Sequence, residues 1–242
     1  FAETTARAEA VERMVAGSLD ISRASPDEIA HVVCKSVQSA TGAEMVSFYK
    51  YDEATQKLSF AEAIGFSQDK IEWAKSHLKF YPGEECGLIG LVASTHMSLY
   101  LPDCEIDPRY KCLQDLESAI KSAYFVPLVF GERLFGVIEL SASKPHAFLP
   151  AQRALADLFA YHAASALENA RLLAQTREAE KQYRSIFENV TEGIYQITPS
   201  GKFITVNPAM SRILGYDSPD ELLKNLNHSQ QFYTDPNRHT EF

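Results

Sequence analysis

The sequence predicts an α+β fold: an antiparallel sheet with helices packed on one face, and a long C-terminal helix that leads into a smaller α+β unit. Two observations predict it. Stretches with a hydrophobic period of two occur in pairs joined by short turns, which is typical of β-hairpins. Stretches with a period of three to four residues lie before, between and after these pairs. Hairpins grouped with helices in this way indicate an α+β domain.

Two helices and a hairpin are expected first. Residues 1–20 carry apolar side chains at three-to-four spacing, which predicts an amphipathic N-terminal helix. A second helix is expected from Ser25, because serine suits an N-cap and Pro26 suits the first helical position. The stretches EMVSFYKYD and KLSFAEAIG then predict a hairpin that turns over residues 52–56.

Helix and strand alternate in the following part. SQDKIEWAKSHLKF predicts a helix, a shorter helix follows the glycines of YPGEECGLIGLVAST, and MSLYLPD predicts a strand that enters a long loop. A short helix over CLQDLESAI precedes the clearest hairpin, SAYFVPLVFGERLFGVIELSAS, which turns at Gly131 and Glu132.

A helical pattern without Gly or Pro begins at Pro150 and continues for about 40 residues, or about 60 Å at the rise of an α-helix. One of its stripes can lie on the sheet: Leu155, Phe159, His162, Ala166, Ala170 and Leu173. A second stripe recurs every seven residues, as in a parallel coiled coil: Leu158, Ser165, Leu172, Ala179 and Ile186. We therefore expect a homodimer through this helix and the N-terminal helix. The alternative is a helix without a partner, whose first part is buried against the domain and whose second part is exposed to solvent.

The composition argues against two classes of partner. With 45% hydrophobic and 23% charged residues, the chain resembles ordinary globular proteins. Its net charge of -9 argues against nucleic acid, because phosphate binding requires clustered Lys and Arg. No apolar run approaches the roughly 20 residues that span a bilayer. We expect no membrane association within the chain, and a cytoplasmic location.

The start of the chain and its cysteines add two expectations. The chain begins at Phe1 rather than at Met, so we expect a segment of a longer protein, and its start shows no signal-peptide pattern. Cys34, Cys86, Cys104 and Cys112 show no CxxC spacing, which indicates reduced thiols rather than a disulfide scaffold.

Residues 21–173 closely resemble a GAF domain. The resemblance depends on an ordered set of motifs in GEECGLIGLVASTHMSLYLPDCEIDPRY and VPLVFGERLFGVIELSAS: the spaced glycines, the Pro-Asp-x-x-x-Asp-Pro-Arg-Tyr loop, and the Val-Pro-Leu and Gly-Val-Ile-Glu-Leu strands. It implies a cavity on one face of the sheet for an unknown small molecule, with residues 101–120 crossing its mouth. The side chains expected to line or cover this cavity are Phe48, Phe60, Phe80, Ile89, Tyr100, Leu101, Asp103, Tyr110, Phe125 and Glu139. The same aromatic side chains could instead fill the space as a core.

Residues 188–242 resemble the N-terminal part of a PAS domain. The motif is SIFENVTEGIYQITPSGKFITVNPAMSRILGY, with expected strands over 193–198 and 202–207 and a helix from Pro208. Residues 174–187 would form a linker helix, continuous with the last helix of the GAF domain. PAS domains continue through a further helix and three strands, so we expect only part of the domain here.

Together these domains resemble the sensory part of a bacterial signal-transduction protein. The resemblance implies a non-enzymatic segment, in which the GAF domain binds a small ligand or serves as a dimeric coupling module. It would act on the PAS domain and on an output domain outside the segment, such as a histidine kinase or a diguanylate cyclase. Two alternatives are a GAF-fold thiol enzyme similar to free methionine-R-sulfoxide reductase, and a dimerisation scaffold without a ligand.

The loop YLPDCEIDPRYKCL offers thiols and carboxylates for three kinds of chemistry, each of which the sequence disfavours. A metal site would mix soft and hard ligands at a spacing that no common zinc pattern uses. A covalent bilin, as in cyanobacteriochromes, usually needs His directly after the cysteine, whereas Glu105 follows Cys104 and Leu113 follows Cys112. The reductases place a cysteine in the Gly-x-x-Gly turn, where this chain has Ile89. We therefore expect no metal and no cofactor.

Other catalytic and nucleotide motifs are incomplete. SKPHAFLPAQR keeps only part of the signature of cyclic-nucleotide-binding GAF domains. His162 lacks the acidic residue and the proline that accompany a kinase phosphoacceptor, so we interpret it as a core or dimer-seam residue.

Overall fold

The structure is a computed structural model that describes residues 28–110 and 120–226. The expected N-terminal helix over 1–20, the helix start at Ser25, and Cys112 lie outside the described residues. The chain divides into two compact units between Arg171 and Leu172, within one continuous helix. Each unit is described by itself.

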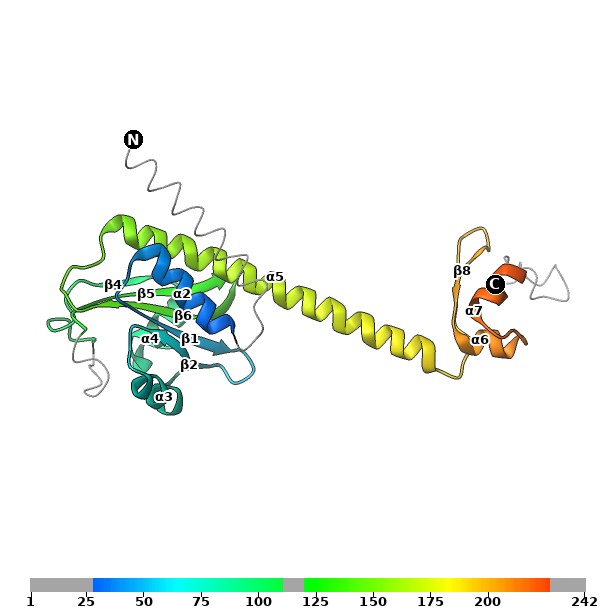
Figure 1. The fold of residues 1–242 in the computed structure, drawn as a ribbon, viewed down its shortest axis with the longest axis horizontal. Coiled ribbons are helices and arrows are strands. Elements are labelled where there is room, and N and C mark those ends of the chain that lie inside the picture. The colour runs from blue at the N-terminus through cyan, green and yellow to red at the C-terminus, as the bar shows by residue number, and fades with distance from the viewer. Residues whose placement is uncertain (1–27, 111–119, 227–242) are drawn as a thin grey trace, which may run out of the picture. The chain divides into compact units, whose positions relative to one another are not determined.

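The first unit contains a six-stranded antiparallel sheet in the order β3-β2-β1-β6-β5-β4 (Figure 1). Its two long hairpins are the ones that the period-two patterns predict. Because β1 and β6 pair in the centre, the two hairpins form one sheet. The strands are β1 (Met45–Asp52), β2 (Lys57–Ile64), β3 (Lys79–Phe80), β4 (Leu99–Leu101), β5 (Ser122–Phe130) and β6 (Arg133–Ala142).

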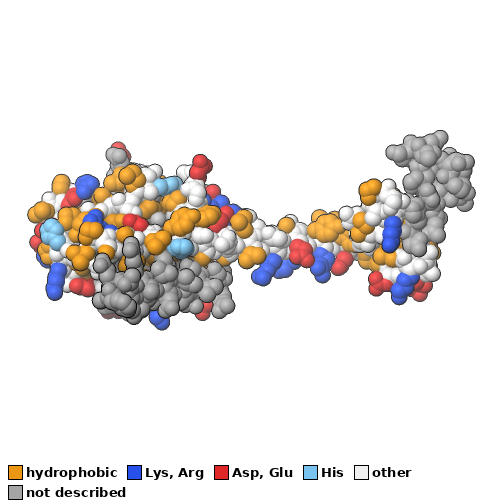
Figure 2. Space-filling view, turned by 90° about the horizontal axis from the view of Figure 1, so that it is seen from above, with side chains coloured by type: hydrophobic (Ala, Val, Ile, Leu, Met, Phe, Trp, Pro, Cys, Tyr) orange, Lys and Arg blue, Asp and Glu red, His pale blue; other side chains and the backbone are white. Residues whose placement is uncertain are grey.

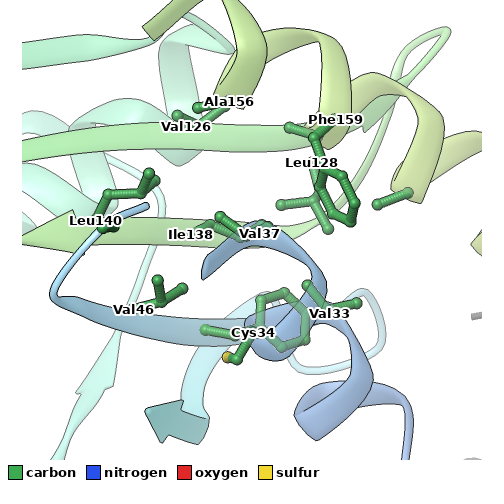
Figure 3. Packing of buried hydrophobic residues seen from close by; sticks show 14 of the residues in the cluster. Val33, Cys34, Val37, Val46, Val126, Leu128, Ile138, Leu140, Ala156 and Phe159 are labelled. Atoms are coloured by element: carbon green, nitrogen blue, oxygen red, sulfur yellow. The ribbon is translucent and has the colours of Figure 1, made fainter. Parts of the chain in front are cut away.

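Two helices, α2 (Ile29–Thr41) and α5 (Pro150–Asn189), contribute to the core on one face of the sheet (Figure 3). Val33 and Val37 of α2 pack there with Phe159 of α5, and each is at most 1% exposed. Figure 3 shows these side chains converging on Ile138 and its neighbours in the sheet.

A second core lies on the opposite face. It is covered by α3 (Gln68–His77) and α4 (Gly87–Thr95), which a 3-10 turn (Glu84–Cys86) precedes. The α+β class and the antiparallel sheet are confirmed, but the expectation that the helices lie on one face is wrong. The reason is visible in β6, whose residues from Gly136 to Ala142 are all buried. A strand that is buried on both faces requires cover on both faces.

The long helix is confirmed as one element of 40 residues, but the predicted sheet-facing stripe is partly wrong. Phe159 and Ala166 are buried as predicted, whereas His162 and Leu173 are exposed. His162 is therefore not a core residue. The buried face is made mainly of alanine, since small side chains let the helix approach the sheet and α2 closely: Ala156, Phe159, Ala160, Ala163, Ala164 and Ala166.

In the second unit, the last part of α5 is followed by the hairpin that the sequence predicts, β7 (Tyr195–Ile197) and β8 (Phe203–Val206). Two short helices follow, α6 (Pro208–Ile213) and α7 (Pro219–Asn225). Phe203, Val206 and Leu222 form its small core.

Asn207 connects the hairpin to α6 in this unit and is fully buried. Its side-chain oxygen accepts hydrogen bonds from the backbone N–H groups of Ile194 and Met210, both at 2.9 Å. Its amide donates to the carbonyl oxygen of Glu192 at 2.9 Å. One side chain therefore caps the helix and fixes the start of the hairpin.

Candidate functional site

A pocket lies on the α3/α4 face of the sheet. About 320 Å³ of space lies between and in front of its walls, which includes open solvent at its mouth. Five apolar residues form its walls: Phe60, Phe66, Ile71, Leu78 and Ile120. Four residues bring polar groups to it: Ser47, Tyr49, Lys70 and Glu139. An apolar cavity with a few convergent polar groups is the usual form of a small-molecule site.

The two central strands position the polar floor of this pocket. Alternation along β1 places Ser47 and Tyr49 on the pocket face, and Ser47 lies directly opposite Glu139 in the pairing of β1 with β6. The Tyr49 hydroxyl donates a hydrogen bond of 3.2 Å to Oε2 of Glu139. Glu139 is only 4% exposed, and a carboxyl group at such a position is costly unless it is hydrogen-bonded.

Aromatic contacts hold the Tyr49 ring in place. The rings of Phe60 and Phe80 each meet it edge to face, with centroids 5.5 Å apart. Such geometry is favourable for aromatic pairs. The hydroxyl that contacts Glu139 is therefore carried by a ring fixed in the core.

Helix α3 supplies the opposite wall. Ile71 is buried against the apolar core, while its neighbour Lys70 is partly buried and lines the pocket. The pocket therefore carries a carboxyl group on the sheet and an amino group on the helix.

The predicted cavity residues divide among four environments. Phe60 and Glu139 line the pocket. Five others belong to the core on the same face without lining the pocket: Phe80, Ile89, Leu101, Tyr110 and Phe125. Asp103 shapes the loop after β4, since its Oδ1 accepts the backbone N–H of Glu105 at 3.0 Å.

The remaining two predicted residues lie on the other face and do not line the pocket. Phe48 is buried in the α2/α5 core, opposite Ile138. Tyr100 packs against the same core and meets the Tyr124 ring edge to face. The physical reason is strand parity: in β1 and β4 the neighbouring residues, rather than these two, lie on the pocket side of the sheet.

Sequence reasoning missed seven of the residues that line the pocket. They are Ser47, Tyr49, Phe66, Lys70, Ile71, Leu78 and Ile120. One signal could have found part of this set. Polar residues inside apolar strands, Ser47 in β1 and Glu139 in β6, share one face once the two strands are paired in register.

The described cysteines do not form a pair of reactive thiols in the pocket. Cys34 is buried in the α2/α5 core, and burial strongly raises the pKa of its thiol. Cys104 is buried in the α3/α4 core, and Cys86 is partly buried in the 3-10 turn. Within residues 28–110 and 120–226, no cysteine lines the pocket and no group of three or more His, Cys, Asp or Glu is placed to hold a metal ion.

A separate candidate surface lies on α5. Leu158, Leu172 and Ile186 are 43%, 47% and 65% exposed. In the predicted seven-residue stripe, Ala179 is also exposed and Ser165 is partly buried. Figure 2 shows hydrophobic side chains at the surface of this helix, between charged ones. We name the five residues of this stripe the α5 stripe.

Solved structures with a similar fold include GAF domains. The GAF domain of a phosphoenolpyruvate-protein phosphotransferase from Coxiella burnetii is 21% identical, with a TM-score of 0.57 over 69% of this chain and 96% of that chain. A free methionine-R-sulfoxide reductase from Neisseria meningitidis, in complex with its substrate, is 16% identical, with a TM-score of 0.54 over 68% of this chain and 91% of that chain. Residues 122 to 287 of a methyl-accepting chemotaxis protein are 22% identical, with a TM-score of 0.53 over 65% of this chain and 98% of that chain. At these identities the similarity shows a shared fold.

The other comparisons concern the sequence and possible membrane spans. No curated protein matches the chain. Among the helices that the structure describes, none is both long and apolar enough to cross a membrane. A PAS domain model matches residues 181–241, and a GAF domain model matches residues 23–168. Since the GAF match spans more than half of the sequence, the chain belongs to the GAF domain family and carries a PAS domain match after it.

Proposed function

We propose that this chain is the sensory part of a bacterial signal-transduction protein, in which the GAF domain binds a small molecule and α5 transmits its occupancy to the PAS domain. GAF and PAS domains are regulatory modules, and one similar structure comes from a chemotaxis protein. In this account the segment itself carries out no catalysis, and the response belongs to an output domain to which the PAS domain connects.

The continuity of α5 is the observation that carries this proposal. Phe159 and Ala163 near its start are buried in the GAF core, so movement of the sheet or of α2 must be accommodated by this helix. The same helix continues without a break to Asn189, beyond the start of the PAS match at residue 181. A helix of 40 residues is about 60 Å long, which allows it to act between separate units.

Coupling of this kind requires two arrangements of the helix, in which the GAF pocket has different affinities for the ligand. A ligand shifts such an equilibrium only by the difference between those affinities. We propose that the two arrangements are two packings of a parallel dimer along the α5 stripe. Its exposed leucines and isoleucine supply the apolar seam that such a pair of helices buries.

Native mass spectrometry of freshly purified protein tests both halves of this proposal. The expected spectrum shows two chains together with a small molecule that dissociates on activation. A strictly monomeric chain would contradict the coupling half. A dimer without any retained or added ligand would favour the dimerisation scaffold instead.

The thiol-enzyme alternative rests on the similarity of fold to the methionine sulfoxide reductase. The described cysteines argue against it, because Cys34 lies on the face of the sheet opposite the pocket and its thiolate is disfavoured. The check is direct: the reduced protein is incubated with free methionine-R-sulfoxide, and our proposal expects no formation of methionine. Sustained turnover would overturn this part of the proposal.

A further inference from the structure

Two glutamates and two arginines gather where α5 leaves the GAF core, just before the boundary between the two units. We name these four residues the exit cluster: Glu53, Arg133, Glu168 and Arg171. We propose that the exit cluster is a latch with two alternative sets of ion pairs, which holds α5 in one of two positions against the sheet. The inference rests on the proposed sensory function and adds what sets the position of α5 within one chain.

In the structure, each ion pair of the exit cluster stays within one part of the fold. Glu53, directly after β1, pairs with Arg133, the first residue of β6, so this pair joins two neighbouring strands of the sheet. Glu168 and Arg171 pair within α5, through hydrogen bonds of 2.8 and 2.6 Å from the guanidinium to the two carboxylate oxygens. Neither of these pairs connects the helix to the sheet.

The two pairs lie close enough to influence each other. The hydrogen bond that Arg171 donates lowers the pKa of Glu168, and the positive charge of Arg133 on the sheet acts in the same direction. The same hydrogen bond raises the pKa of Arg171, and the negative charge of Glu53 on the sheet adds to this effect. Each charged group of the helix therefore already interacts with a group of opposite charge on the sheet. In the second set, Arg133 pairs with Glu168 and Arg171 pairs with Glu53, which connects α5 to both hairpins.

The packing of α5 near its exit allows such a change of position. The buried residues of α5 after Phe159 are all alanines, and Ala166 is the last of them, with Leu167 partly buried beside it. Small side chains make shallow ridges on a helix, so they interlock less with the facing surface than large ones do. The exit of α5 is therefore held less firmly than its start, where Phe159 is buried in the core.

The weakness of exposed ion pairs suits this role. All four side chains are partly exposed, from 15% at Glu168 to 66% at Glu53. Such pairs contribute little to stability, because water also solvates their charges, so one set can replace the other at a small cost in free energy. A ligand can shift an equilibrium between two states when their free energies are similar.

The sheet half of the exit cluster is connected to the pocket by the two central strands. Both β1 and β6 contribute side chains to the pocket. Glu53 follows the end of β1, and Arg133 begins β6. A shift of either strand on ligand binding would therefore move one charge of the exit cluster relative to α5.

Thermal unfolding of charge-reversal variants tests the latch. Arg133→Glu brings like charges together at Glu53, and Glu168→Arg does so at Arg171, so each single variant should lower the midpoint by about 2 °C at low salt. The double variant, Arg133→Glu with Glu168→Arg, makes both original pairs repulsive but can form the exchanged set. We expect its midpoint to lie above those of both single variants. A midpoint that is not above both would overturn the latch, because independent losses would add.

The matched control moves the helix reversal further along α5. Glu180→Arg also brings like charges together within the helix, since Glu180 pairs with Arg184. It lies about 18 Å beyond Glu168 along the helix, at 1.5 Å per residue. Combined with Arg133→Glu, it should show no recovery. The recovery in the first double variant should shrink at about 1 M NaCl, because salt screens exposed charges. Recovery in the control, or recovery that salt leaves unchanged, would contradict exchanged ion pairs.

Amide hydrogen exchange of two double variants locates the change. Glu53→Arg with Arg133→Glu keeps an ion pair within the sheet but makes both exchanged contacts repulsive, so it retains the observed set. In Arg133→Glu with Glu168→Arg, residues 164–171 should exchange at least about threefold more slowly than in that variant, because the exit of α5 is connected to the sheet. Equal rates in the two variants would contradict the second position of α5.

Failure of the latch can be distinguished from failure of the proposed function, because these measurements need neither a ligand nor a second chain. If the midpoint does not recover while native mass spectrometry finds a dimer with a bound molecule, the latch is wrong and sensing stands. If the midpoint recovers in a strictly monomeric chain, the latch stands and coupling through a dimer is contradicted.

Discussion

Ser47, Glu139 and Ser141 are buried polar residues on one face of otherwise apolar strands. An apolar side chain at these positions would give a more stable fold, because the cost of burying a polar group must be offset by hydrogen bonds. The Tyr49 hydroxyl offsets part of that cost at Glu139. Their presence is the residue-level reason for treating this face as a binding site rather than as a filled core.

Gly136 of β6 lies in close contact with Phe48 and Tyr49 of the neighbouring strand β1. A Cβ atom there would meet the carbonyl oxygen of Tyr49 and lie 2.6 Å from Cε2 of Phe48. Gly136→Ala should therefore lower the free energy of unfolding by at least about 2 kcal/mol. The control is Gly131→Ala in the turn of the same hairpin, which has open space but a φ of +61° and should cost about 1 kcal/mol. Equal costs in urea denaturation would contradict the close contact.

The residue scale also shows where prediction from the sequence failed. Glu139 and Phe60 could be identified from motifs, but Phe48 could not be assigned to the correct face. Residues 46–49 of β1 are all buried, so alternation alone does not tell which of its two faces points to the pocket. Only the register with β6 decides which neighbour faces the pocket, and that register comes from pairing between distant segments.

At the scale of elements, α5 is attached to the sheet by large and small side chains together. Phe159 is 1% exposed, and Phe159→Ala should lower the free energy of unfolding by about 3 to 5 kcal/mol, because it leaves a cavity among side chains that cannot close it. The control is Leu149→Ala just before the helix, where the side chain is 62% exposed and the change should stay within about 0.5 kcal/mol. A small effect of Phe159→Ala in denaturant titration would show that α5 is not anchored in this core.

A polar contact fixes the same helix to the edge of the sheet. The Tyr124 hydroxyl of β5 lies 2.7 and 2.8 Å from the two carboxylate oxygens of Asp157, and Ser98 donates to Asp157 at 2.7 Å. The Arg153 guanidinium lies 4.4 Å from the centre of the Tyr100 ring. Burial raises the pKa of Tyr124 to about 12, and the hydrogen bond to Asp157 acts in the same direction.

This contact predicts a dependence of stability on alkaline pH. The folded pKa of Tyr124 exceeds the value of about 10 expected in the unfolded chain, so the folded state resists ionisation. Its contribution is complete below pH 10 and is lost as the pH rises toward 12. Between these values the free energy of unfolding of the wild type should fall more steeply than that of Tyr124→Phe. Parallel pH profiles of the two proteins would contradict the assignment.

Most elements could be predicted because their signals are local. Period-two stretches gave both hairpins, and the absence of Gly and Pro gave the full extent of α5. The buried face of α5 could not be predicted in the same way. It consists mainly of alanines, whose burial depends on how closely α2 and the sheet approach, and no hydrophobic period in the helix reports that distance.

At the scale of the whole molecule, the account depends on one helix shared by two units. The parallel pairing proposed for the α5 stripe predicts which positions face each other across the dimer. Ala179→Cys should form an intermolecular disulfide under mild oxidation, because it lies on the stripe. Lys181→Cys, two residues away and off the stripe, is the matched control and should cross-link at least about tenfold more slowly. Equal rates on non-reducing gels would contradict parallel pairing in this register.

The order of the domains could be predicted from the sequence, since the motifs of both families are linear. The chemistry of the pocket could not, because the pocket is assembled from β1, β2, α3 with residues on either side of it, β6, and Ile120 ahead of β5. Lys70 and Glu139 are 69 positions apart, and only the fold brings them to one cavity.

Sedimentation equilibrium across a wide range of protein concentration tests the central claim most directly. The claim is that α5 pairs with a second copy and can therefore transmit the state of the GAF pocket. The account predicts a species of twice 27.0 kDa, which Leu172→Ser shifts toward the single chain. A mass of 27.0 kDa at every concentration would contradict the account, and so would a dimer that Leu172→Ser leaves unchanged.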